Sequence, residues 1–88
     1  MKIHELKTWK EFFWNIETGK KNFEVRKNDR DFRMGDVLYL KEIDKHTKEY
    51  TGKSCLREIT YILDAQGEFG IEKGVVILSL KEIGKGNY

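Results

Sequence analysis

The chain has 88 residues, of which 36% are charged and 39% hydrophobic, and its formal net charge is +2. This length suffices for one small domain with a limited core, and the composition is typical of a globular domain rather than a disordered segment. The longest apolar run, residues 75–80 with Ser79 inside it, is far below the ~20 residues that span a bilayer, and the N-terminus lacks an apolar secretory region. We expect one domain over residues 1–88, cytoplasmic and without membrane contact.

The sequence offers little for a metal or a disulfide. Cys55 is the single cysteine, and His4 and His46 are far apart along the chain without other Cys or His nearby. A structural metal site needs about four such ligands at characteristic spacings. We therefore expect no metal and no cofactor, and we interpret Cys55 as an inert packing residue.

The first two predicted elements are a strand and a helix. Residues 1–6 alternate weakly and are expected to form a short strand. A helix is predicted from Thr8, which has capping-box spacing to Glu11, to Gly19, a residue type that ends helices in the left-handed conformation. Trp14 lies outside the apolar stripe at 100° per residue, so it is either a stacking platform for a ligand or a second packing wall. The expected core stripe is Trp9, Phe12, Phe13 and Ile16.

After the helix the period changes to two. Phe23 and Val25 lie on one face of a predicted half-buried strand, and Glu24 and Arg26 share the other. Further strands are predicted at residues 37–43, 56–63 and 75–83, separated by polar turns at 27–36 and 44–52 and by a glycine-rich loop at 64–74, with a loose tail at 84–88. This order predicts an α+β fold, a small closed β-barrel with the helix across one end. Closure also removes exposed strand edges.

Positive charge is concentrated in residues 20–33, which hold six Lys/Arg and three Asp/Glu, a local net of +3. Lys21, Glu24 and Arg26 are the leading candidates for a ligand site, because a carboxylate can accept from the amine of a nucleobase while arginine stacks on the base or binds a phosphate. The alternative is a solvated loop with an exposed ion pair worth ~0–1 kcal/mol. His4 and Lys7 are candidates for the cleft mouth and Arg30 for its rim, although each of these has an ordinary structural interpretation.

These segments together resemble a known family. Gly19-x-Lys21-x-x-Glu24-x-Arg26, then Phe32-x-x-Gly35-Asp36-x-Leu38 and the apolar strand at 75–79, are similar to the ASCH domain of the PUA-like superfamily, closest to a bacterial and phage branch of unknown function. The resemblance implies a PUA-like barrel of five or six strands with a cleft beside the first helix. It also implies an association with RNA or modified nucleobases.

One small bacterial ASCH protein is an acetylcytidine amidohydrolase that uses a lysine, a threonine and a glutamate. Lys21 matches its lysine, but Glu24 stands where its threonine nucleophile stands. We therefore expect an RNA- or nucleotide-binding module whose candidate ligand residues are Lys21, Glu24, Arg26, Trp14, His4, Lys7 and Arg30. The alternatives are a small amidohydrolase acting on an acylated nucleoside through Lys21 and Glu24, and a module that docks a protein partner.

Overall fold

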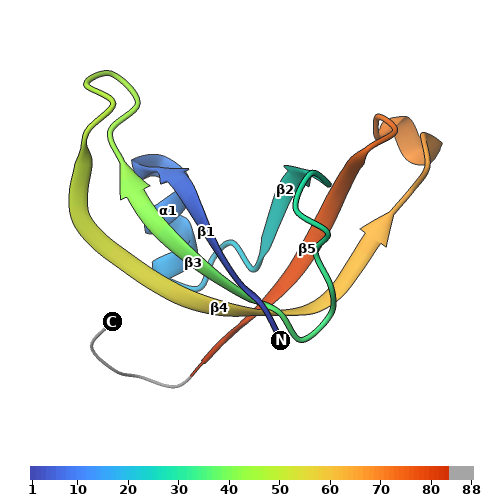
Figure 1. Ribbon diagram of the computed structural model, residues 1–88. Helices are drawn as coiled ribbons and strands as arrows, with labels where there is room; N and C mark the ends of the chain where they lie inside the picture. Colours follow the sequence, from blue (N-terminus) through green and yellow to red (C-terminus); the bar gives the residue numbers. More distant parts are fainter. Residues whose placement is uncertain (84–88) are drawn as a thin grey trace.

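A computed structural model describes residues 1–83, which form one strongly curled five-stranded sheet and a short helix (Figure 1). The sheet order is β1-β3-β4-β5-β2. The prediction of a small α+β barrel-like fold is confirmed, and the predicted loose tail at 84–88 lies outside the described residues. Along the chain, the elements are β1 (Ile3–Trp9), α1 (Lys10–Glu17), β2 (Phe23–Lys27), β3 (Val37–Ile43), β4 (Tyr50–Asp64), the short 3-10 helix η1 (Glu68–Gly70) and β5 (Val75–Glu82).

The longest strand, β4, belongs to both halves of the sheet. Its first part pairs antiparallel with β3 and its second part with β5, so that it runs as one long arc under the others (Figure 1). The register of β4 against β5 shifts between Ile59 and Tyr61, and a second shift occurs in β3 between Lys41 and Ile43. Such irregularities increase the local bend and twist of a strand. The curl of the sheet follows from them.

The sheet is an open half-barrel rather than the closed barrel that we predicted. β1 pairs in parallel with β3, β2 pairs antiparallel with β5, and within residues 1–83 these two edge strands do not pair with each other. Side chains cross between them instead. Arg26 donates to the carbonyl oxygen of Lys7 at 2.8 Å, and Arg30 to that of Glu5 at 2.9 Å. The free edge of β1 is thus protected by guanidinium groups instead of a neighbouring strand.

The helix begins later than predicted. β1 continues through Thr8, which is buried, and Trp9 is the extended residue before the helix without a side-chain cap. The capping-box prediction was therefore wrong, because Thr8 serves as an inward strand residue. The predicted end is confirmed: Gly19 follows the helix with a φ of +82°. The helix has eight residues, and nowhere in residues 1–83 is a helix long and apolar enough to cross a bilayer.

The core lies on the inner side of the curled sheet, under the helix. Only two residues of the predicted apolar stripe contribute to it, Phe13 and Ile16, whereas Trp9 and Phe12 are 44% and 41% exposed. A helix of eight residues buries only the side chains on the face that packs on the sheet. Trp9, the last residue of the preceding strand, points away from the core. The remaining buried members of the core come from the strands and from the loop before β3: Leu6, Phe32, Leu38, Leu40, Cys55, Ile59, Val76, Leu78 and Leu80.

Cys55 is expected to resist thiol reagents in the folded protein. Its side chain is part of the core, and burial raises the pKa of the thiol, so that the reactive thiolate is scarce at neutral pH. Labelling with a disulfide reagent should be at least tenfold slower in native buffer than in denaturant. A native rate equal to the denatured rate would contradict the burial of this residue.

Candidate functional site

The strand β2 presents its polar face to the interior of the half-barrel. Glu24 is only 4% exposed, whereas Phe23 and Val25 are 43% and 53% exposed. The period of two predicted for this segment is confirmed. A carboxylate buried to this extent must be paired with cations or hydrogen-bond donors, since the cost of burying an unpaired charge is several kcal/mol.

Glu24 is paired on both sides. Lys21 Nζ lies 2.8 Å from Glu24 Oε1, and Arg26 Nε lies 2.8 Å from Glu24 Oε2. Lys21 also donates to the carbonyl oxygen of Phe23 at 2.7 Å, and Arg26 Nη2 lies 3.5 Å from the hydroxyl of Thr8. We call Lys21, Glu24 and Arg26 the charged trio. It carries a formal net charge of +1, and it is a partly buried network centred on buried Glu24 rather than the exposed surface pair that the sequence left as an alternative.

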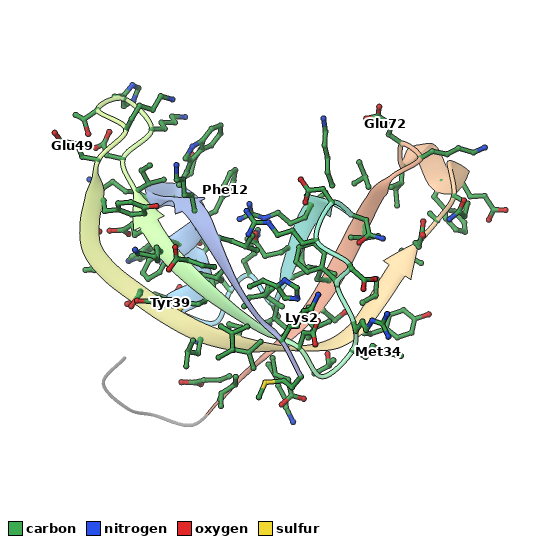
Figure 2. All side chains as sticks on the ribbon, in the orientation of Figure 1. Lys2, Phe12, Met34, Tyr39, Glu49 and Glu72 are labelled. Carbon is green, nitrogen blue, oxygen red and sulfur yellow. The ribbon has the colours of Figure 1, made fainter. Side chains whose placement is uncertain are left out.

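The charged trio lies in a hollow of about 640 Å³, which we call the aromatic hollow. Trp9 and Phe12 are stacked, with ring centroids 6.0 Å apart and an angle of 18° between their planes. Lys21 Nζ lies 4.8 Å from the ring centroid of Phe23 and 5.5 Å from that of Phe12. Figure 2 shows Phe12 in the opening between the β1 side and the β2 side of the half-barrel. The complete lining is Lys7, Thr8, Trp9, Phe12, Lys21, Phe23, Glu24, Val25 and Arg26.

A second hollow, of about 470 Å³, adjoins the first. We call it the polar hollow, and it shares Lys7 and Arg26 with the aromatic hollow. Arg26 of β2 and Arg30 of the loop that follows β2 both donate to carbonyl oxygens of β1, and their side chains form part of its wall. Its lining is Glu5, Leu6, Lys7, Arg26, Arg30 and Tyr50.

The structure brings five of the seven candidate residues to these two hollows. Lys21, Glu24, Arg26 and Lys7 line the aromatic hollow, and Arg30 lines the polar hollow. Trp14 lines neither. It is 52% exposed, and the ammonium of Lys20 lies 4.8 Å from the centroid of its ring.

His4 also lines neither hollow. Its Nε2 lies 2.8 Å from Asp36 Oδ2, both side chains are buried, and its ring meets that of Phe32 edge-on at a centroid distance of 4.8 Å. Asp36 further accepts from the backbone N–H groups of Lys2 and Arg33. Burial raises the pKa of Asp36, but these backbone donors and His4 outweigh it and bring the pKa to about 2. The pair joins the start of β1 to the turn before β3.

Sequence reasoning missed the aromatic side chains of the hollow. Trp9 and Phe12 were assigned to the core, and Phe23 was given no role in the site. One signal was present for Phe23: Glu24 and Arg26 share one face of the predicted strand, so placing these ions inside requires Phe23 and Val25 to lie outside. That argument predicts one exposed ring, that of Phe23, beside the ions.

The fold and the site define a class of protein: a small α+β domain whose open half-barrel holds a charged trio among aromatic rings. The chain belongs to the family of DUF3850, a domain of unknown function, whose family model matches residues 3–80. It is 38% identical over 63 residues to a protein of Escherichia phage P2 described as "Uncharacterized 12.9 kDa protein in GpA 3'region". This match covers 72% of the chain and 56% of the phage protein, so the chain spans little more than half of that relative. The predictions that the family is one of unknown function and that the chain has a phage relative are confirmed.

Proposed function

We propose that this protein binds RNA or a nucleotide, with a nucleobase seated in the aromatic hollow, and that its half-barrel is of the PUA-like, ASCH type. The observation that carries the proposal is the placement of the charged trio among the rings of Trp9, Phe12 and Phe23 in one hollow. The ASCH resemblance of the motif from Gly19 to Arg26 supports the same function.

The chemistry of the hollow matches that of a base in two respects. Every base has a flat face that stacks on aromatic side chains, with about 1–3 kcal/mol gained per base. Every base also has an edge with hydrogen-bond donors and acceptors, which single-stranded recognition reads directly. The hollow offers exposed rings for the face, the carboxylate oxygens of Glu24 as acceptors, and N–H groups of Lys21 and Arg26 as donors.

Binding is favoured over hydrolysis by the state of Glu24. Each of its oxygens already accepts from a cation at 2.8 Å, and the lone pair that remains on each oxygen can still accept from the edge of a base. A general base needs a carboxylate within hydrogen-bond reach of the hydroxyl or water that it activates. Among residues 1–83 no side-chain hydroxyl bonds to Glu24, and that of Thr8 accepts from Arg26 Nη2 at 3.5 Å. Turnover of acetylcytidine that Lys21→Ala abolishes would reverse this ranking.

The two tryptophans provide a matched test of the proposal. Trp9→Ala is expected to weaken the binding of a short single-stranded RNA or a nucleotide roughly ten- to hundredfold, since one stacking partner is lost. Trp14→Ala removes an equally large exposed ring outside the hollow and should leave affinity within about twofold. Fluorescence anisotropy with labelled RNA, and calorimetry with nucleotides, measure both affinities.

The charged side of the hollow is tested separately. Lys21→Ala combined with Arg26→Ala should abolish measurable binding. Because this double variant also leaves Glu24 without its cations, its affinity is measured at a temperature at which far-UV circular dichroism shows it to be folded. If this double variant binds RNA and nucleotides as well as the parent, or if Trp14→Ala weakens binding more than Trp9→Ala does, the hollow is not the binding site. Stoichiometric capture of a protein partner on the aromatic hollow, with no nucleic acid bound, would replace the proposal with a docking function.

A further inference from the structure

The polar hollow is electropositive. It is lined by the cationic side chains of Lys7, Arg26 and Arg30 and by one carboxylate, that of Glu5. Glu5 Oε1 in turn lies 3.9 Å from Lys41 Nζ, which offsets part of its charge. A concave surface lined by charges of one sign concentrates counter-ions of the other sign. An anion is therefore the expected occupant.

The two arginines are held at a fixed separation. Arg26 Nη2 donates to the carbonyl oxygen of Lys7 and Arg30 Nη1 to that of Glu5. These carbonyls are two residues apart on one edge of β1, which places them about 7 Å from each other. The planar fork of a guanidinium group matches the oxygens of a phosphate, and two forks at this separation can flank one phosphate. The volume, about 470 Å³, exceeds the ~30 Å³ of a single water many times over.

Each guanidinium group has donors to spare. Five N–H bonds are available per arginine, and protection of the β1 edge uses one N–H for each carbonyl. The hydrogen bonds made within residues 1–83 leave Arg26 Nη1 and Arg30 Nη2 without an acceptor. A ligand with several oxygen acceptors satisfies these groups.

We propose that the polar hollow binds the phosphate of the nucleotide whose base occupies the aromatic hollow, so that the ligand is a phosphorylated nucleotide and not a free nucleoside. The inference rests on the proposed function and narrows it. Arg26 lines both hollows. Its Nε donates to Glu24 in the aromatic hollow, and its Nη2 donates to the carbonyl oxygen of Lys7 at the edge of β1, beside the polar hollow. Base and phosphate of one nucleotide thus reach opposite sides of the same guanidinium group.

Arg30 allows the test, because it lines the polar hollow and is absent from the aromatic hollow. The affinities of the four ribonucleosides and of their 5′- and 3′-monophosphates are measured by calorimetry on the full chain, at low and at moderate salt. At least one monophosphate should bind tenfold or more tightly than its nucleoside, and that advantage should shrink with salt. Arg30→Gln should remove most of the tenfold advantage and leave nucleoside affinity unchanged.

Arg33→Gln is the matched control. Arg33 lies three residues further along the same loop, pairs with Asp31 at 3.2 Å as an exposed ion pair, and lines neither hollow. Arg33→Gln should change neither the nucleoside affinity nor the monophosphate affinity. A short single-stranded RNA with uncharged methylphosphonate linkages distinguishes a strand from a mononucleotide as the source of the phosphate. Arg30→Gln should weaken the normal strand and leave the uncharged strand unaffected.

Several outcomes overturn the inference. If nucleosides and monophosphates bind equally well to the parent protein, the phosphate site is wrong while the proposed function stands. If Arg30→Gln lowers the melting temperature but preserves the phosphate advantage, the arginine only protects the edge of β1, and the inference fails. If no nucleoside, nucleotide or RNA binds at all, the proposed function fails and takes the phosphate site with it.

Discussion

Replacing Asp36 by alanine is expected to lower the free energy of unfolding by about 3 kcal/mol, a large part of the stability of a domain this small. The carboxylate accepts from the backbone N–H groups of Lys2 and Arg33 and from the ring of buried His4. Without it, three buried or half-buried donors lose their acceptor together. The connection between β1 and the turn before β3 loses its polar anchor. Urea unfolding followed by circular dichroism measures the change.

The same residue predicts how stability depends on pH. The pKa of Asp36 is about 2 in the folded protein, against an ordinary value of 3.8. A lowered pKa means that the carboxylate stabilises the fold above pH ~4 and that this contribution, about 2 kcal/mol, is lost as the pH falls from ~4 to ~2. Asp36→Asn should therefore unfold with a weaker pH dependence over that window than the parent protein.

Asp31 supplies the control for both measurements. Its carboxylate forms an exposed ion pair with Arg33, and pairs of this kind contribute ~0–1 kcal/mol. Asp31→Asn keeps a side chain suited to the φ of +49° at this position, so it should lower the free energy of unfolding by less than about 1 kcal/mol and leave the pH dependence below pH 4 in place. Equal effects of Asp31→Asn and Asp36→Asn would show that the buried pair with His4 contributes no more to stability than an exposed ion pair.

Replacing Glu24 by alanine is expected to cost about 3 kcal/mol of stability and to abolish ligand binding as well. Removing the carboxylate leaves Lys21 and Arg26 side by side without their common counter-charge. Glu24→Gln keeps the shape and one acceptor oxygen, so its loss of stability should be smaller than that of alanine. Chemical denaturation and the RNA-binding assay report the two effects.

Glu58 is the matched control for this variant. It lies in β4 and pairs with Lys81 of β5 at 3.7 Å, with both side chains substantially exposed. Glu58→Ala should change the free energy of unfolding by no more than about 1 kcal/mol and leave binding intact. If Glu24→Ala proves as mild as Glu58→Ala, burial of the charged trio is not a source of stability.

The order of the elements could be predicted from the sequence, whereas which side chains of each element are buried could not. The alternation over residues 23–27, the strands predicted at 37–43 and 75–83 and the stop at Gly19 are local patterns, and the structure has them within one residue of where they were expected. Whether a strand buries its odd or its even residues depends on its neighbours. At β2 an edge position and two nearby cations put Glu24 inside.

The predicted turn at 44–52 shows another limit. Asp44 accepts from the N–H groups of His46 and Thr47 and closes the turn early, so β4 already begins at Tyr50. Gly52, which favours a turn by residue type, lies within the strand with a φ of +95°. The register with β3 gives Gly52 no partner and shifts at this point, so the strand continues through an irregularity at the glycine instead of ending there.

For the candidate site, the ions could be predicted, and so could the exposure of Phe23, whereas the exposure of Trp9 and Phe12 could not. Lys21, Glu24 and Arg26 were recognised from charge density and motif, and they do share one hollow. The pairing of Arg26 and Arg30 with β1 carbonyls depends on an open sheet, which no local pattern indicates. Trp9 is exposed because β1 runs on through Thr8, and the capping-box spacing concealed that continuation.

The pairing of β2 with β5 has a consequence for how the molecule assembles. Phe23 is opposite Ser79, whereas β3, β4 and β5 follow one another along the chain and pair with their sequence neighbours. Closing a short loop costs less entropy than closing a long one, so we expect the three-stranded meander to form first. Residues 3–27 then attach to its two outer strands, β1 at one side and β2 at the other. The aromatic hollow is lined from both β1 and β2, so it forms only at this last step. A ligand that contacts both strands would therefore stabilise the folded domain.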